Sequence, residues 1–276
     1  MIVQTLVATT LREMLSKATL YILLGISTLV LLGTFATFSS ISTDEGIVLK
    51  IFGLPVSPPT HTEEIAPLVF ATQSGLARGL FLGLMLFGVF ATAGLVPDVL
   101  EKGVVELYLA KPMARWQLLL GKYLGGAVAI GIVTIYFIGG VWLTFGIRVG
   151  VWNTQFLLSS LTMTFMFTAI LSIVVLLGVL FRNAAVPIIG CFLYLMVLDN
   201  LLEHRETILY VVSESVLYRG LCDLLFYLLP QVSGMQQQLQ RQIMHEAVEW
   251  QPFLQSLFSS GLLFGLAWWV LDRRDL

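Results

Sequence analysis

Charged residues are scarce in this chain of 276 residues. Only 12% are Asp, Glu, Lys or Arg, 57% are hydrophobic, and the mean hydropathy is +0.89. Soluble domains carry about 25% charged residues. So little charge leaves too little polar surface for soluble domains, which predicts a protein that crosses a membrane several times. The formal net charge of -2, without a basic stripe, indicates no nucleic-acid partner.

Residues typical of catalytic and metal sites are also few. The three histidines and two cysteines follow no metal-ligand spacing, and no G-x-S-x-G elbow is present. Gly121 and Lys122 do not belong to a phosphate-binding loop, because Tyr123 replaces the required Ser or Thr and Trp116 replaces the first glycine. We therefore expect no enzymatic activity, metal, cofactor or nucleotide site in this chain.

Six long runs without charge are the main positive feature. A membrane-spanning helix needs about 20 mainly apolar residues. The predicted spans are about 18–38, 79–97, 123–147, 154–181, 184–202 and 253–271. The fifth span is the shortest, and Asp199 at its outer end is expected to be a solvated end residue. Together the runs predict an all-α integral membrane protein, with a single transmembrane domain over residues 1–276.

Lys and Arg residues predict the orientation of the six spans, which place both termini on one side. Cytoplasmic termini put Arg12, Lys17, Lys102, Lys111, Arg115, Lys122, Arg182, Arg273 and Arg274 inside. They put Lys50, Arg78, Arg148, Arg205, Arg219 and Arg241 outside. The inner group lies in short segments close to the span ends, and the outer group lies mostly in two long loops. This bias favours cytoplasmic termini.

The segments between and before the spans have their own patterns. Residues 1–17 carry apolar residues at i, i+3 and i+4 spacing, which predicts an amphipathic helix, either in the inner membrane interface or packed on its own protein. In the outer segment 39–77, clustered prolines favour extended turns over a helix. The outer segment 203–252 predicts a helix ended by Pro230 and then a second, polar helix.

Residues 98–122 are too charged to form a further span. Each charge near the bilayer centre costs roughly 2.5–3.5 kcal/mol, so the total is on the order of 10 kcal/mol. Between Gly103 and Pro112 there is room for about two helical turns, with Glu106 near the start and Lys111 at the end, as a helix dipole favours. This predicts a short cytoplasmic helix joined rigidly to the second and third spans.

The run EKGVVELYLAKPMARWQLLLGKYLG resembles the signature loop of the permease subunits of ATP-binding cassette (ABC) transporters of the type-2 exporter class. That loop has an acidic residue, Gly-Thr, a leucine-rich turn, Pro, Arg and Leu-Leu-Gly-Lys. These fall on Glu101, Gly103, Leu107, Leu109, Pro112, Arg115 and residues 119–122. Val104 replaces the usual Thr and removes a hydroxyl that caps the helix. The six spans, the N-terminal helix, Leu-Leu-Pro at 228–230 and the basic C-terminal end are similar too.

The resemblance implies a function and a set of partners. It assigns coupling to the ATPase to Glu101, Gly103, Glu106, Leu107, Pro112, Arg115, Gly121 and Lys122. The implied partners are two cytoplasmic ATP-binding subunits, which bind ATP-Mg, and a second permease copy in a homodimer or heterodimer. Membrane lipids and an outer-face or periplasmic partner complete the set. The implied location is the bacterial inner (cell) membrane.

Two other functions fit parts of the sequence, namely a self-sufficient secondary carrier or channel and a non-transporting membrane scaffold. Ion-coupled carriers usually place carboxylates near the membrane midplane, and the predicted span interiors have no ionisable residue. The permease of an ABC transporter is therefore the leading hypothesis, with the energy supplied by another subunit. The sequence does not specify the cargo.

Overall fold

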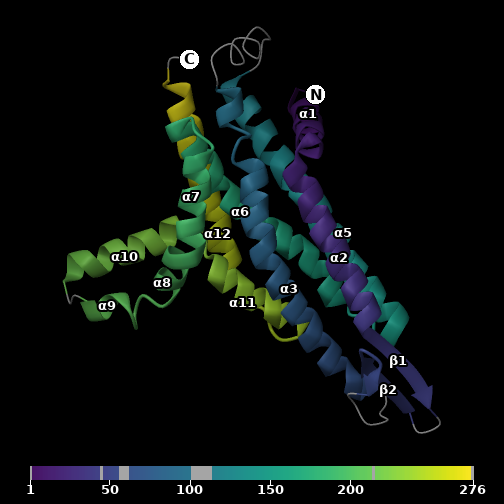
Figure 1. The fold of residues 1–276 in the computed structure, drawn as a ribbon. Coiled ribbons are helices and arrows are strands. Elements are labelled where there is room, and N and C mark those ends of the chain that lie inside the picture. Colours follow the sequence, from purple (N-terminus) through teal and green to yellow (C-terminus); the bar gives the residue numbers. More distant parts are fainter. Residues whose placement is uncertain (1, 44–45, 56–61, 101–113, 213–214, 275–276) are drawn as a thin grey trace.

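The computed structural model describes residues 2–43, 46–55, 62–100, 114–212 and 215–274. In this part of the chain, six helical segments are long and apolar enough to cross a membrane, which confirms the predicted all-α membrane class. These segments are Ala18–Thr37, Ile65–Val99, Arg115–Val149, Thr154–Phe181, Ala185–Glu203 and Gln251–Asp272. A small sheet, which the sequence did not predict, accompanies them (Figure 1).

The elements follow one another in a simple order. They are α1 (Ile2–Ser16), α2 (Ala18–Thr37), β1 (Phe38–Thr43), β2 (Gly46–Ile51), β3 (Leu54–Pro55), α3 (Thr62–Thr92), the 3-10 turn η1 (Pro97–Val99), α5 (Arg115–Val149), α6 (Thr154–Phe181), α7 (Ala185–Leu193), the π-helical turn η2 (Tyr194–Leu198), α8 (Asp199–Glu203), α9 (Leu209–Val212), α10 (Val216–Leu228), α11 (Val232–Ile243) and α12 (Gln251–Asp272). Both termini lie at one end of the bundle, and the sheet lies at the other (Figure 1).

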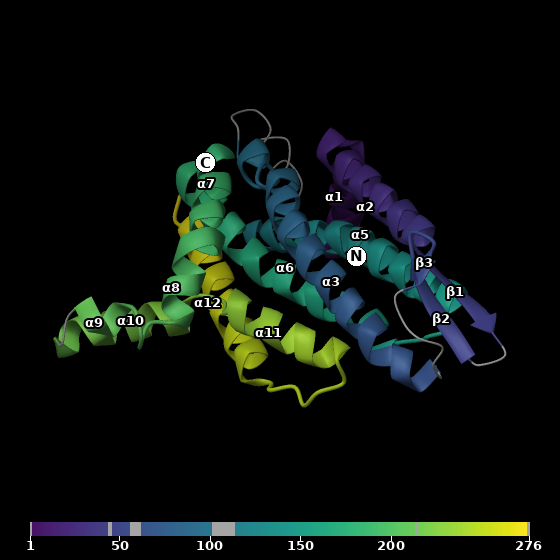
Figure 2. The same cartoon turned by 60° about the horizontal axis from the view of Figure 1, so that its bottom comes forward.

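Helix α6 forms the centre of the bundle. It contacts α3, α5, α7, α11 and α12 (Figure 2). Its Phe156, Met163 and Phe167 side chains are fully buried. Helix α2, in contrast, leaves Leu29 and Leu32 largely exposed on the outside of the bundle. A helix that is apolar all round suits a core or a lipid environment, so this pattern fits a bundle surrounded by lipid.

The segment 39–77 differs from its prediction. Its first part forms the antiparallel sheet β1-β2-β3, in which Phe38 pairs with Ile51. Its second part begins α3, which runs through Pro67, so the prediction of extended turns was wrong there. Ile65 and Val69 are buried in the core. We infer that their burial outweighs the hydrogen bond lost at Pro67, because tertiary packing supplies most of a helix's stability.

Helices α9 and α10 project sideways from the bundle as an arm (Figure 2). One carboxylate holds the arm together, because Asp223 Oδ1 accepts from Tyr210 Oη at 2.6 Å and from Arg205 Nε at 2.8 Å. These hydrogen bonds from Tyr210 and Arg205 favour the charged form and lower the pKa of Asp223. Several apolar side chains of the arm are exposed, including Leu217 and Leu221.

Helix α11 is shorter and more buried than the polar helix predicted there. It ends at Ile243, and its Met235, Leu239 and Ile243 side chains lie in the core. Polar groups hold its far end, where Asn153 Nδ2 donates to the Ile243 carbonyl at 3.1 Å and to Gln73 Oε1 at 2.9 Å. Asn153 thereby links α3, α6 and α11.

The Asp199 carboxylate caps the start of α11. The sequence predicted a solvated residue at this position, and that prediction was wrong. Its side chain is 6% exposed. Its carboxylate accepts from Val232 N at 3.1 Å, Ser233 N at 2.8 Å and Ser233 Oγ at 2.6 Å. The first N–H groups of a helix have no partner within it, and Asp199 supplies one from another helix.

Candidate coupling site at the start of α5

The structure describes only part of the predicted coupling site. Glu101, Gly103, Glu106, Leu107 and Pro112 lie outside the described residues. Arg115, Gly121 and Lys122 lie in the first turns of α5. The turn η1 precedes the segment 101–113, and Ala114 follows it. The described part of the site therefore consists of the two stretches that flank this segment, η1 before it and the start of α5 after it.

Arg115 binds the end of α12. Its Nη1 donates to the Leu271 and Asp272 carbonyls, each at 3.1 Å, and to the Arg274 carbonyl at 2.8 Å. The last carbonyls of a helix lack partners within the helix and carry partial negative charge. The Arg115 guanidinium supplies these carbonyls with hydrogen-bond donors and with a positive charge. The start of α5 is thereby fixed to the C-terminal end of the chain.

Arg274 extends this network to α6. Its Nη1 donates to the Val179 carbonyl at 2.6 Å, and its Nη2 donates to the Leu180 carbonyl at 2.8 Å. Both carbonyls belong to the last turn of α6. Two arginines thus connect the start of α5, the end of α12 and the end of α6. The sequence revealed the basic C-terminal end, but no local pattern revealed which carbonyls it binds.

The other flank of the segment has a weaker link. Lys17, between α1 and α2, pairs with Asp98 of η1 at 3.5 Å, and the two side chains are 28% and 53% exposed. Exposed ion pairs contribute little to stability, typically less than about 1 kcal/mol. This pair marks the contact between the α1–α2 junction and the chain just before residue 101.

Gly121 and Lys122 hold α1 against α5. Lys122 is buried, with 4% of its surface exposed, and its Nζ pairs with Glu13 Oε2 of α1. Gly121 lies beneath Leu6, and a Cβ at Gly121 would collide with that side chain. Glu13 was not among the predicted site residues, because nothing in the sequence places it beside Lys122.

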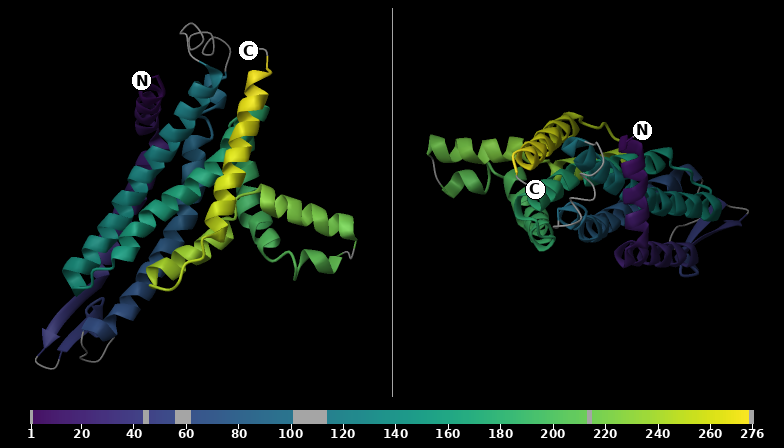
Figure 3. Two further views of the ribbon diagram at one scale, coloured as in Figure 1. Left: turned by 180° about the vertical axis from the view of Figure 1, so that it is seen from behind. Right: turned by 90° about the horizontal axis from the view of Figure 1, so that it is seen from above.

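Helix α1 forms as predicted, and it packs on its own protein. Seen from above, it runs across the bundle rather than along it (Figure 3). Its buried residues are Leu6, Thr10 and Met14, which share one face, and Leu6 and Thr10 lie against Gly121 and Gly125 of α5. A position in the membrane interface stays a prediction for its other face.

Together these contacts fix the described parts of the chain on either side of residues 101–113. The segment joins η1 and α3 on one side to α5 on the other. Arg115 and Arg274 connect α5 to α12 and α6, and Lys122 connects it to α1. The chain that flanks the segment is therefore linked to α1, α6 and α12 in addition to α3 and α5.

The fold and the described flanks of the site define a class of protein, a multi-pass helical membrane protein whose chain ends lie at one end of the bundle. The family model described as ABC-2 family transporter protein matches residues 3–276, and the chain belongs to this family. It is thus the permease component of an ABC transporter, as the resemblance implied. No curated protein matches the sequence.

Proposed function

We propose that this permease couples ATP hydrolysis by two separate cytoplasmic ATP-binding subunits to export or to conformational work across the bacterial inner membrane. It acts with a second permease copy, identical or related, and both of its termini lie in the cytoplasm. ATP-Mg binds to the partner subunits and not to this chain. The observation that carries the proposal is the Arg115 network beside residues 101–113.

The proposed mechanism is a rigid-body switch. Closure of the ATP-binding subunits moves residues 101–113, which are continuous with the chain leading to α3 and α5. Arg115 carries the displacement to α12, and Arg274 carries it from there to α6. Small shifts at such a contact produce two discrete arrangements, because packed helices repack between states rather than deform continuously. Cargo or an outer partner makes contact with the outer segments, which are 39–77, with the sheet β1-β2-β3, and 203–252.

The first test is the role of Arg115. We expect the full chain, purified in mild detergent, to bring down an ATP-binding subunit. In that complex, Arg115→Ala lowers stimulated ATP turnover about tenfold, because hydrogen bonds to a charged group contribute about 1.5–3 kcal/mol and 1.4 kcal/mol is a factor of ten. Arg115→Lys gives an intermediate rate, since one ammonium group cannot reproduce the planar guanidinium. The measurement is phosphate release in proteoliposomes.

Arg12→Ala is the matched control. Arg12 is an exposed residue of α1 that makes no hydrogen bond or ion pair with the residues the structure describes, and its loss should leave turnover unchanged. Normal turnover in an assembled Arg115→Ala complex would remove the coupling role. Transport by the purified chain with only an ion gradient would favour a carrier, and partner binding without any stimulation of ATP turnover would favour a scaffold.

A further inference from the structure

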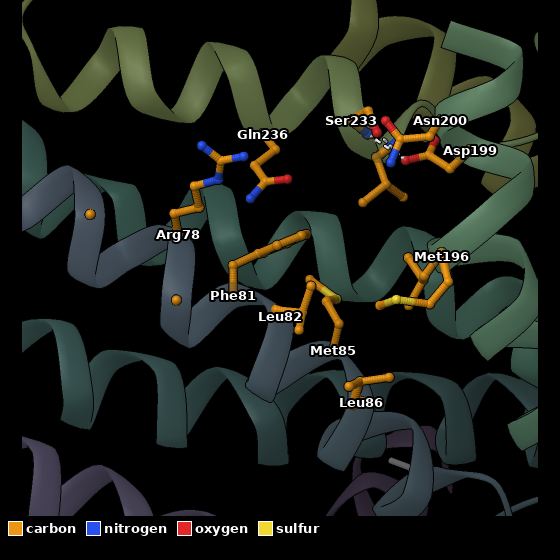
Figure 4. Close-up of a pocket in the computed structure, with 14 residues that line it drawn as sticks. Arg78, Phe81, Leu82, Met85, Leu86, Met196, Asp199, Asn200, Ser233 and Gln236 are labelled. Atoms are coloured by element: carbon orange, nitrogen blue, oxygen red, sulfur yellow. Dashed lines mark hydrogen bonds between the residues drawn. The ribbon is translucent and has the colours of Figure 1, made fainter.

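A cavity of about 550 Å³ opens between three elements on the side of the bundle (Figure 4). They are α3, the region of η2 and α8, and the start of α11. Its volume lies within the range of ligand pockets, about 300–1,000 Å³. The cavity lies outside the coupling site described above, and the role proposed for residues 101–113 does not enter the inference drawn from it.

The cavity has a polar part and an apolar part. Figure 4 shows Arg78 and Gln236 together on one side and Asn200 beside Ser233 on the other, with Leu82, Met85 and Leu86 below in this view. On α3, Arg78 is followed by these apolar residues at i+4, i+7 and i+8, which places all four on one face of the helix. This face changes from cationic to apolar over about two turns.

Arg78 has no counter-charge among the residues the structure describes. It makes no hydrogen bond or ion pair with them, and α3 continues for several turns on both sides of it. Asp199 also lines the cavity, but backbone N–H groups and the Ser233 hydroxyl occupy both of its oxygens. Arg78 directly precedes the predicted span 79–97, where a charged side chain needs a partner or contact with the headgroup region. The Gln236 amide likewise has no described hydrogen-bond partner.

The backbone leaves space beside this charge. A Cβ placed on Gly75 or Gly79, which flank Arg78 on α3 and line the cavity, would meet no atom within 4 Å. On the facing wall, the π-helical turn η2 places Met196 toward the cavity. Such turns interrupt α-helices and are frequent at functional sites. The cavity is therefore open at the level of Arg78 and apolar below it.

We propose that this cavity binds one membrane lipid with an anionic headgroup. The phosphate faces Arg78 and Gln236, and the first acyl carbons lie on Leu82, Met85 and Leu86. An arginine guanidinium suits a phosphate because its planar N–H groups donate two parallel hydrogen bonds. The apolar wall supplies the remainder of the affinity and excludes a soluble anion as the preferred ligand.

The probe is phosphatidylglycerol mixed equally with phosphatidylcholine in nanodiscs that hold the full chain. Native mass spectrometry measures the lipids that stay bound to the chain after it is released from the nanodiscs. The wild-type chain should retain one phosphatidylglycerol in preference to phosphatidylcholine. Arg78→Gln should lower that preference about tenfold, because it removes one charge-assisted contact. Arg241→Gln is the matched control, since Arg241 lies near the far end of α11 and pairs with Glu249 outside the cavity.

A second variant fills the cavity and keeps the charge. Gly79→Leu should remove the retained lipid, whereas Gly139→Leu on α5, where a Cβ also meets no atom within 4 Å, should not. Soluble glycerol phosphate should not displace the lipid. The proposal is overturned if Arg78→Gln keeps the wild-type preference, if Arg241→Gln loses as much as Arg78→Gln, or if glycerol phosphate alone displaces the lipid.

Discussion

Asp199→Ala is expected to lower the free energy of unfolding by about 3 kcal/mol, since each buried donor left without a partner costs about 1–3 kcal/mol. The carboxylate is the acceptor for Val232 N, Ser233 N and Ser233 Oγ at the start of α11. Without the carboxylate, these donors lose their acceptor within the protein, at a residue that is only 6% exposed. Chemical unfolding in detergent, followed by circular dichroism, measures the change.

Two further variants sharpen this prediction. Asp199→Asn keeps one acceptor oxygen and should fall between the wild type and the alanine variant. Glu203→Ala removes a carboxylate from the same short helix, α8, but from a position without a bond to α11, and should change stability little. If Asp199→Ala and Glu203→Ala unfold at the same denaturant concentration, the cap does not hold α11.

Glu13→Gln is expected to lower the free energy of unfolding by about 1.5–3 kcal/mol, the usual contribution of a hydrogen bond to a charged group, because the pair is buried at Lys122 and partly exposed at Glu13. It leaves the Lys122 ammonium buried, because that residue is only 4% exposed. Lys122→Met should cost less, since the Glu13 side chain is 33% exposed and can reach water. The double variant should cost less than the sum of the two. Unfolding curves for the four proteins give this coupling energy.

The contact between α1 and α5 has an independent test in its glycines. Gly121→Val places a side chain where Leu6 lies, and it should release α1. Gly139→Val adds the same groups to open space on the same helix and should leave α1 in place. Limited proteolysis near residue 12 reports the release. Equal cleavage of both variants, or independent effects of Glu13→Gln and Lys122→Met, would contradict the docking of α1 through Lys122.

The spanning helices could be predicted because lipid imposes a length and a composition on each span. Residues 154–181 show this, since their uncharged run coincides with α6. The start of α3 could not be predicted, because Pro67 and its neighbours signal turns locally, whereas the burial of Ile65 and Val69 is decided by other helices. The sequence therefore reports the membrane environment better than it reports packing between helices.

In the candidate site, too, the sequence revealed the residues but not the contacts they make. Arg115, Gly121 and Lys122 were identified from their resemblance to a known loop, without any indication of what they contact. Their partners are the α12 carbonyls, Leu6 and Glu13, which lie far away in sequence. Asp199 was misjudged for the same reason, because a carboxylate at the end of an apolar run has the same local sequence whether water or another helix receives it.

The most direct measurement concerns the side of the membrane on which residues 101–113 act. A Tyr108→Cys variant, with Cys191 and Cys222 replaced by serine, is treated with a membrane-impermeant maleimide in intact cells and in inverted vesicles. We expect labelling only in inverted vesicles, with protection when the ATP-binding subunits are bound. Labelling in intact cells, or equal labelling with and without those subunits, would contradict it.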